Sequence, residues 1–259
     1  MARVRLQDLT WVEVREKARA GVPVIIPFGS QEQHGPQTPM GDFAICEAVA
    51  VAAAERAGAI VAPVIAAGYS EYFKPYPGTI SLRSSTLAAL LEDYVDCLMR
   101  QGFERIIFFN GHNGNNGTVD VIVRKLRDER GIRIPVVTPL AFRTPAMVKE
   151  LFPNGGQGHG GAMMTALQLH LNPQNCRMDL ACEGKLHEWN GLKVTDLTKV
   201  EFEGSPVGIY FNYDEITDPT GVVGDGREAT AEKGKLLFEH MVAGSAGFVE
   251  WSKGVSWKA

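Results

Sequence analysis

Two short segments with apolar side chains on both faces constrain the fold of this chain more than any other feature. They span residues 22–28 and 105–109. A strand exposed on one face would alternate apolar and polar residues, whereas a central strand of a parallel sheet is apolar throughout. Two further apolar runs, 59–63 and 134–139, predict additional short strands. These segments therefore predict a parallel sheet that is buried on both faces.

Helical patterns fill the intervals between the predicted strands. Thr10 stands at the N-cap position of the first helix, and Gly21 and Gly58 follow the ends of the first two. The predicted helices span residues 9–20, 42–57, 84–100, 117–130, 145–151, a segment ending near 171, and 228–242. Between 173 and 226 the pattern predicts only short strands and loops. The alternation of strand and helix predicts an α/β fold, in which sites lie at the carboxyl ends of the strands.

Length, charge and cysteine content narrow the class of protein. The 259 residues contain no linker-like segment, so we expect one domain spanning 1–259. The net charge of −4 and the lack of a basic cluster argue against nucleic acid or an anionic membrane as partners. No apolar run of about eighteen residues predicts a membrane span, and the first residues do not resemble a signal peptide. The four cysteines have no CxxC spacing, so we expect reduced thiols and a cytoplasmic protein.

The turn after the first buried strand, residues 29–42, carries side chains that bind metals. Glu32 and His34 are two residues apart, so an extended backbone puts both on one face, and Asp42 returns at the start of the next helix. His112 follows the second buried strand, and a parallel sheet would bring it to the same edge. Carboxylate plus imidazole is a ligand set of Zn²⁺, Mn²⁺ or Fe²⁺, of which we expect Zn²⁺ first. The sequence therefore predicts a metal site with the ligands Glu32, His34, Asp42 and His112.

Taken singly, each of these residues also has a structural explanation. Asp42 could cap its helix, and the two histidines could hydrogen-bond to the backbone of their turns. Their combination at the ends of two strands favours the metal site. Ser30 could be offered for Ser/His/Asp catalysis, but the chain has no GxSxG elbow. The glycines around His159 match no phosphate-binding loop, so we interpret them as room for a substrate beside that histidine.

An aromatic loop at residues 66–83 precedes the third predicted helix. Its tyrosines, prolines and glycines are typical of a structured loop that either packs on its own rings or lines a substrate site. From this loop we expect Tyr69 and Ser70 to bind substrate, together with Asn113 from the turn after the second buried strand.

Four motifs carry a resemblance to a known family. They are Gly-Ser-x-Glu-Gln-His-Gly-Pro from residue 29, Gly-Asp at 41–42, Phe-Asn-Gly-His-x-Gly-Asn from residue 109, and His-Gly-Gly from residue 159. Segments 77–82 and 221–234 extend the similarity over most of the chain. Together they resemble the creatininase family of metal-dependent amidohydrolases. The resemblance implies a three-layer α/β/α sandwich, usually hexameric, with a dinuclear metal centre at the carboxyl edge of the sheet.

The resemblance also implies a role for each predicted site residue. Glu32 and His112 would hold one metal, and His34 would belong to the other. Asp42 would bridge the two ions. His159 would assist proton transfer.

Some positions depart from the family pattern. Gly114 stands where creatinine-hydrolysing members have a carboxylate, and Met164 where many other members have a glutamate. Because methionine is a poor ligand for hard divalent ions, we expect an effectively mononuclear site. Creatinine hydrolases carry Trp, Asp and Glu where this chain has Gly155, Gly156 and Gly158, which argues against creatinine as the substrate.

The sequence thus predicts a homo-oligomeric hydrolase in which metal-activated water opens a small cyclic substrate at an amide C–N bond. One alternative is C–C cleavage in a cyclic keto-polyol such as 3-dehydro-scyllo-inosose, which the hydroxyl-rich loop at 69–76 would suit. A second alternative is a degenerate member that binds a ligand without catalysis, motivated by the missing carboxylates.

Overall fold

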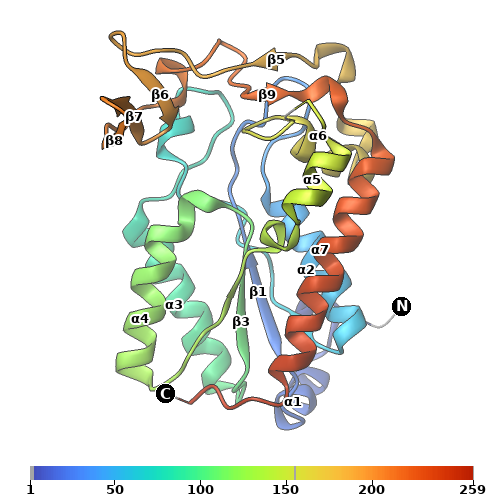
Figure 1. Cartoon of the computed structure of the whole chain (residues 1–259). Coiled ribbons are helices and arrows are strands. Elements are labelled where there is room, and N and C mark those ends of the chain that lie inside the picture. The colour runs from blue at the N-terminus through green and yellow to red at the C-terminus, as the bar shows by residue number, and fades with distance from the viewer. Residues whose placement is uncertain (1–2, 155, 259) are drawn as a thin grey trace.

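A four-stranded parallel sheet lies between two layers of helices in the computed structural model, which describes residues 3–154 and 156–258 (Figure 1). The strands run in the order β2-β1-β3-β4. Their bounds are β1 (Val24–Phe28), β2 (Ile60–Val61), β3 (Ile106–Asn110) and β4 (Val136–Val137). β1 and β3 pair along their whole length, from Val24 opposite Ile106 to Phe28 opposite Asn110. The predicted α/β fold with a mostly parallel central sheet is confirmed.

Seven α-helices are present in the described part of the chain. They are α1 (Trp11–Arg19), α2 (Phe43–Ala57), α3 (Ser84–Arg100), α4 (Asn116–Arg130), α5 (Pro145–Leu151), α6 (Ala162–Leu171) and α7 (Ala231–Ser252). The predicted N-cap of the first helix is confirmed, because Thr10 and Glu13 form a reciprocal capping box. Gly58 ends α2 in the left-handed conformation, as expected for a C-cap glycine.

The apolar side chains of the central strands alternate between the two helical layers. Val24, Ile26 and Phe28 of β1 pack in the cluster that includes α3 and α4. Ile25 of β1 and Ile107 of β3 pack in a second cluster with α2 and α7. Figure 1 shows these two helix pairs on opposite sides of the sheet. Burial on both faces explains why the strands contain no polar alternation.

Most elements differ from their predicted bounds by a few residues, and α7 and β4 differ most. α7 extends to Ser252, ten residues beyond the predicted end, through Gly244 and Gly247. A Cβ at Gly244 would lie 2.4 Å from the Phe142 ring, so this glycine lets the helix approach its neighbour closely. β4 is shorter than predicted, because a 3₁₀ turn begins at Pro139 and proline cannot donate to the ladder.

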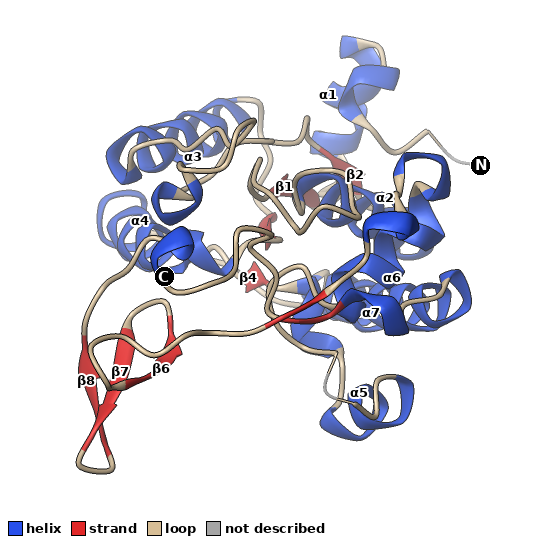
Figure 2. Ribbon diagram, turned by 90° about the horizontal axis from the view of Figure 1, so that it is seen from above, coloured by secondary structure: helices blue, strands red, loops and turns tan. Residues whose placement is uncertain are grey.

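Residues 183–225 form two small antiparallel sheets above the carboxyl edge of the main sheet (Figure 1). One pairs β5 (Glu183–Gly184) with β9 (Gly224–Asp225), and the other contains β6 (Lys193–Asp196), β7 (Lys199–Phe202) and β8 (Ser205–Gly208). Figure 2 shows this second sheet projecting away from the helices. It has an apolar cluster of its own, formed by Val194, Val200, Phe211 and Ile216.

Two further features concern the cysteines and the length of the helices. All four cysteines are free thiols. Within the described residues, no helix combines the length and apolar character needed to cross a membrane.

Candidate metal centre

Five predicted site residues meet at the carboxyl edge of the sheet. Glu32, His34 and Asp42 lie on the loop from β1 to α2, His112 follows β3, and His159 precedes α6. Because β1 and β3 are neighbours, the loops that follow them start side by side. Glu32, His34, Asp42 and His112 are buried, and the side chain of His159 is 15% exposed. The fold therefore gathers residues that are up to 127 positions apart.

Glu32, Asp42 and His112 form a first potential ligand group. Nδ1 of His112 lies 3.0 Å from Oδ2 of Asp42, and Nε2 lies 3.4 Å from Oε2 of Glu32. One ligand atom from each residue lies within 4.8 Å of the others. Two carboxylates and one imidazole at this spacing suit a divalent ion.

Asp42 occupies the N-cap position of α2 without capping it, because its side chain makes no capping hydrogen bond. Its Oδ1 instead accepts a hydrogen bond from the Ser30 backbone N–H at 2.7 Å, and Oδ2 faces His112. The approach depends on Gly29, where a Cβ would lie 2.4 Å from Oδ1 of Asp42. The explanation of Asp42 as a simple helix cap is therefore wrong.

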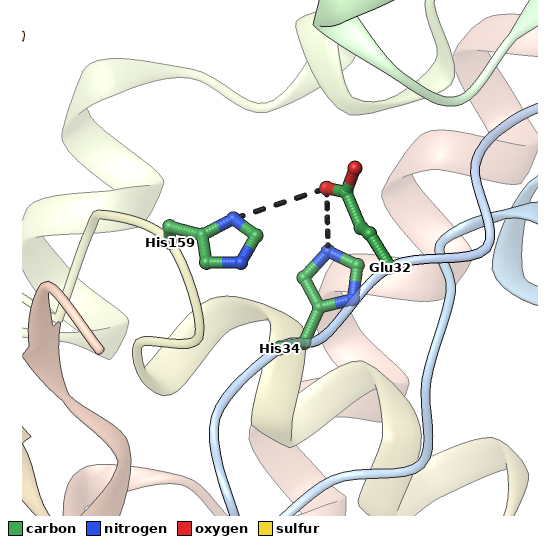
Figure 3. A group of neighbouring side chains, drawn as sticks. All are labelled: Glu32, His34 and His159. Atoms are coloured by element: carbon green, nitrogen blue, oxygen red, sulfur yellow. Dashed lines mark ion pairs between the residues drawn. The ribbon is translucent and has the colours of Figure 1, made fainter. Parts of the chain in front are cut away.

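A second potential group consists of Glu32, His34 and His159 (Figure 3). Oε1 of Glu32 lies 3.6 Å from Nε2 of His34 and 3.9 Å from Nδ1 of His159. The two groups share Glu32, whereas the resemblance implied that Asp42 would be the shared residue. The second group contains one carboxylate and the first contains two, so the second group offers less negative charge to a cation.

The His159 ring is held on both faces and at one nitrogen. Its ring stacks between His34, at a centroid distance of 4.8 Å, and Phe73, at 4.1 Å. Tyr213 meets it edge-on at 4.9 Å. Nε2 lies 2.6 Å from the backbone carbonyl of Gln33. Since a carbonyl only accepts, Nε2 carries the hydrogen and Nδ1 presents a lone pair towards Glu32.

The aromatic loop contacts the metal ligands directly. Ser70 donates a hydrogen bond from Oγ to Oε2 of Glu32 at 2.6 Å. The backbone carbonyl of Tyr69 lies 3.0 Å from Nε2 of His112. Both residues predicted to bind substrate thus lie at the site, where they hold the ligands in this geometry. Their contact with substrate stays a prediction.

Asn113, the third predicted substrate-binding residue, is exposed, whereas its neighbour Asn115 is fully buried. Oδ1 of Asn115 accepts from the Tyr69 backbone N–H at 2.9 Å, and Nδ2 donates to the Gly29 carbonyl at 3.1 Å. Asn115 therefore ties the aromatic loop to the end of β1. Sequence reasoning missed this role, although Asn115 belongs to the same motif as His112.

Burial and the neighbouring carboxylates shift the pKa values of the three histidines in different directions. It lowers the pKa of His34 to about 4, against the opposing effect of Asp42. It also holds the pKa of His159 well below its ordinary value, and neighbouring His34 adds to this effect. For His112 burial again opposes the charged ring, but Glu32 and Asp42 outweigh it and raise the pKa well above its ordinary value. Burial raises the pKa of Glu32. The surroundings of His34 and His159 thus favour the neutral ring, whereas those of His112 favour the protonated ring.

The two departures from the family pattern have different surroundings. Gly114 lies beside His112, and a Cβ there would lie 2.3 Å from its Nε2. Met164 packs against the apolar cluster that includes Val49 and Leu237. Of these two positions, only Gly114 therefore lies in direct contact with a predicted metal ligand. Gly155, one of the glycines preceding His159, lies outside the described residues.

The residues present fit a divalent cation. They supply two carboxylates and three imidazoles, a donor set suited to Zn²⁺, Mn²⁺ or Fe²⁺. Two buried polar atoms at the site, Oγ of Ser30 and Nδ1 of His34, have no hydrogen-bond partner within the described residues. An unpaired buried polar group costs about 1–3 kcal/mol. Such atoms are expected where a further ligand completes a site.

Comparison with known proteins identifies the family. The sequence profile of the creatininase family, described as creatinine amidohydrolase, matches residues 7–249. The chain belongs to the creatininase family. It is 32% identical to creatinine amidohydrolase of Pseudomonas putida over 259 aligned residues, which cover 92% of this chain and 93% of that protein.

Other members of the creatininase family differ in their names and substrates. A mycofactocin precursor peptide peptidase of Mycolicibacterium smegmatis is 31% identical, covering 86% of this chain and 82% of its own length. A 3-dehydro-scyllo-inosose hydrolase of Thermotoga maritima is 26% identical, covering 90% and 78%. These proteins are hydrolases by name, and this chain is likewise a hydrolase of the creatininase family.

Solved creatininase structures match the whole fold. A structure named "Creatininase Mn" superposes with a TM-score of 0.81 at 27% identity, covering 98% of this chain and all of that one. A mutant creatininase of the "Zn-Zn type" gives a TM-score of 0.80 at 28% identity with the same coverage. Creatininases have thus been solved with manganese and with zinc.

Proposed function

We propose that this chain is a metal-dependent hydrolase that opens a small cyclic substrate at an amide C–N bond. The observation that carries the proposal is the buried group of Glu32, Asp42 and His112. Burying two carboxylates around one imidazole is costly, and apolar packing alone gives no reason for it. The creatinine amidohydrolase and the peptidase among the relatives both act, by their names, on amide bonds.

Glu32, Asp42 and His112 would hold the ion, with Zn²⁺ as our first expectation and Mn²⁺ or Fe²⁺ as alternatives. When bound, the ion would polarise a carbonyl and lower the pKa of its water towards about 7. The orphaned hydroxyl of Ser30 would then have a partner at the site.

His159 would move the proton. Because Gln33 holds the hydrogen of Nε2, the free lone pair of Nδ1 can accept a proton from the attacking water. As the C–N bond breaks, the same nitrogen returns that proton to the leaving amine. Burial lowers the pKa of His159, so the ring starts neutral and readily passes an accepted proton on to the leaving amine. Stacking between His34 and Phe73 keeps the ring in place throughout.

Cleavage of a C–C bond in a cyclic keto-polyol is the second candidate. It is supported by the similarity to the 3-dehydro-scyllo-inosose hydrolase, at a lower identity of 26%. The hydroxyls of Ser70 and Tyr72, which lie beside Glu32 and His112, would suit a polyol ring. A non-catalytic ligand-binding role is disfavoured, since all five predicted ligand and proton-transfer residues are retained together.

Parallel assays would separate these functions. Protein loaded with Zn²⁺ or Mn²⁺ would be tested on five- and six-membered cyclic amides, on keto-inositols and on a linear peptide amide. We expect turnover of a cyclic amide; turnover confined to keto-inositols would establish the second candidate instead. No turnover of any substrate by metal-loaded protein would favour a non-catalytic role.

Replacement of His112 links the metal to the activity. His112→Ala should abolish both tight metal uptake and turnover, because it removes the only imidazole of the first group. His187→Ala is a matched control. The side chain of His187 is 40% exposed, its Nε2 lies 3.0 Å from Oδ1 of Asp218, and it belongs to neither potential ligand group. Unchanged metal content in His112→Ala would contradict the proposed ligand set.

We further propose that the enzyme acts in the cytoplasm as a homo-oligomer, a hexamer by resemblance to its family. Light scattering coupled to size-exclusion chromatography measures the number of chains per particle, and a monomeric mass would contradict this part of the proposal.

A further inference from the structure

The hydroxyl of Tyr72 lies at the metal site although no sequence motif singles it out. Its Oη is 3.1 Å from Nε2 of His112. The ring is fixed by its neighbours, with Phe73 at a centroid distance of 4.8 Å and Tyr69 at 6.4 Å, both edge-on. A side chain held this firmly presents its hydroxyl to His112 with little loss of conformational freedom on binding.

Gly114 makes room for this contact. A Cβ at that position would lie 2.1 Å from Oη of Tyr72 and 2.3 Å from Nε2 of His112. Both distances are shorter than any tolerated contact, so no side chain at 114 could coexist with the Tyr72 hydroxyl. The phenol therefore occupies the volume that Gly114 leaves free.

The surroundings of Nε2 decide which nitrogen of His112 is available to an ion. The carbonyl of Tyr69 lies 3.0 Å from Nε2 and can only accept, so Nε2 carries a hydrogen. Oγ of Ser70 lies 3.3 Å from the same nitrogen, but its own hydrogen is donated to Glu32. Oη of Tyr72 is thus a further acceptor for the Nε2 hydrogen. The opposite nitrogen, Nδ1, faces Oδ2 of Asp42 at 3.0 Å.

We infer that Tyr72 is a positioning residue of the metal site. Together with the Tyr69 carbonyl it holds the hydrogen on Nε2 of His112, so that Nδ1 and Asp42 face the ion together. Hydrogen bonds to the non-ligating nitrogen fix the tautomer and orientation of a metal-binding histidine. This inference rests on the proposed function, because it assumes that the first ligand group holds a metal.

The test compares Tyr72→Phe with Tyr76→Phe. Tyr76 belongs to the same loop, but its hydroxyl faces Thr217 at 3.3 Å and not His112. Affinity for Zn²⁺ would be measured by competition with a chromophoric chelator, after circular dichroism has shown that the metal-free variants are folded. Loss of such a supporting hydrogen bond typically weakens metal affinity by about 10–100-fold. Because the Tyr69 carbonyl remains, we expect about tenfold in Tyr72→Phe and no change in Tyr76→Phe.

The visible absorption spectrum of the Co²⁺-loaded protein provides a readout that a purely structural role would not move. Without the Tyr72 hydroxyl, either Nδ1 or Nε2 of His112 could bind the ion, which would alter the ligand field of Co²⁺. The spectrum should therefore change in Tyr72→Phe and not in Tyr76→Phe. Gly114→Ala gives a second variant, in which the added methyl displaces the hydroxyl and presses on His112. It should weaken Zn²⁺ binding at least as much.

The possible results distinguish a failure of the Tyr72 role from a failure of the proposed function. Wild-type affinity and an unchanged Co²⁺ spectrum in Tyr72→Phe would overturn the role of Tyr72 while leaving the proposed function intact. Equal losses in Tyr72→Phe and Tyr76→Phe would overturn it as well, because the effect would belong to the loop in general. A wild-type protein that binds no divalent ion would overturn both the inference and the proposed function.

Discussion

His112 is the residue on which the metal centre depends most, because both of its ring nitrogens face acceptors. Asp42 lies at Nδ1, and Glu32 and the Tyr69 carbonyl lie at Nε2. In the metal-free protein the two carboxylates stabilise a second proton on the ring. An ion entering the first ligand group must therefore compete with that proton.

This competition predicts that metal affinity rises with pH. The pKa of His112 is raised above its ordinary value, so the ring is protonated through the neutral range and loses a proton on binding. Because burial also raises the pKa of Glu32 to about 7, the apparent affinity for Zn²⁺ should increase by at least about tenfold per pH unit between about pH 6 and about pH 8, and most steeply below about pH 7. His34 adds no such dependence there, because burial already keeps it neutral.

Chelator competition at several pH values measures this slope, and calorimetry in buffers of different ionisation enthalpy measures the released protons directly. An affinity that stays flat across this range would show that His112 is neutral before the metal binds, contrary to the charge balance described above.

The sequence motifs identified the residues that the fold brings together at the candidate site, but they did not identify the residues that support them. Glu32, His34 and His112 stand in short glycine-rich turns directly after buried strands, where a local pattern is enough to place them. Tyr72 and Asn115 act through contacts across the site. Such contacts depend on how the aromatic loop folds over β1 and β3, and loop geometry is not encoded in hydrophobic periodicity.

At the scale of elements, the buried side-chain amide of Asn115 joins the aromatic loop to the end of β1. Asn115 spans the Tyr69 N–H and the Gly29 carbonyl, and it also donates to Oδ1 of Asn110 at 3.2 Å. Removing this side chain leaves buried backbone groups without partners. The loop and the metal-binding turn after β1 would lose their connection at the same time.

Asn115→Ala should therefore lower the free energy of unfolding by about 1–3 kcal/mol, the cost of leaving such groups unpaired. Asn113→Ala is the matched control, because Asn113 is exposed two residues away and should change stability by less than about 0.5 kcal/mol. Urea unfolding of both metal-free variants measures the difference. Equal stabilities would show that Asn115 does not connect the two loops.

The bounds of helices and strands were predicted well where an apolar pattern extends over the whole element, and poorly where contacts with distant residues decide them. α3 and α5 begin and end at the predicted residues: α3 has a long apolar pattern, and Thr144 caps α5 with Pro145 at its first position. α7 continues past its predicted end because Gly244 packs against Phe142, a contact that no local pattern reveals. The small sheet of β6, β7 and β8 was predicted only as short strands and loops, since its pairing depends on turns between them.

At the scale of the whole molecule, the proposed metal would link segments from separate parts of the chain. Glu32 and Asp42 belong to the turn after β1, and His112 to the turn after β3. An ion bound to all three exists only in the folded chain, so its binding free energy adds to folding stability.

We therefore expect purified protein to hold one tightly bound divalent ion per chain, because the second group has a single carboxylate that it shares with the first. Removing the ion with a chelator should lower the midpoint of thermal unfolding, and adding Zn²⁺ should restore it. Free ion at about 100 times its dissociation constant contributes about 2.7 kcal/mol. Elemental analysis and thermal scans test both points. Two tightly held ions, or an unchanged midpoint after chelation, would contradict this expectation.

The small sheet of β6, β7 and β8 has its own apolar cluster, while Tyr213 from the same part of the chain touches His159. A segment with a separate core can accumulate changes without disturbing the packing between the main sheet and its helices. Changes in this segment can therefore alter the surroundings of His159, through Tyr213, while Glu32, Asp42 and His112 stay constant. Exchange of this segment between relatives would thus test how far the contacts of His159 determine the substrate of the proposed hydrolase.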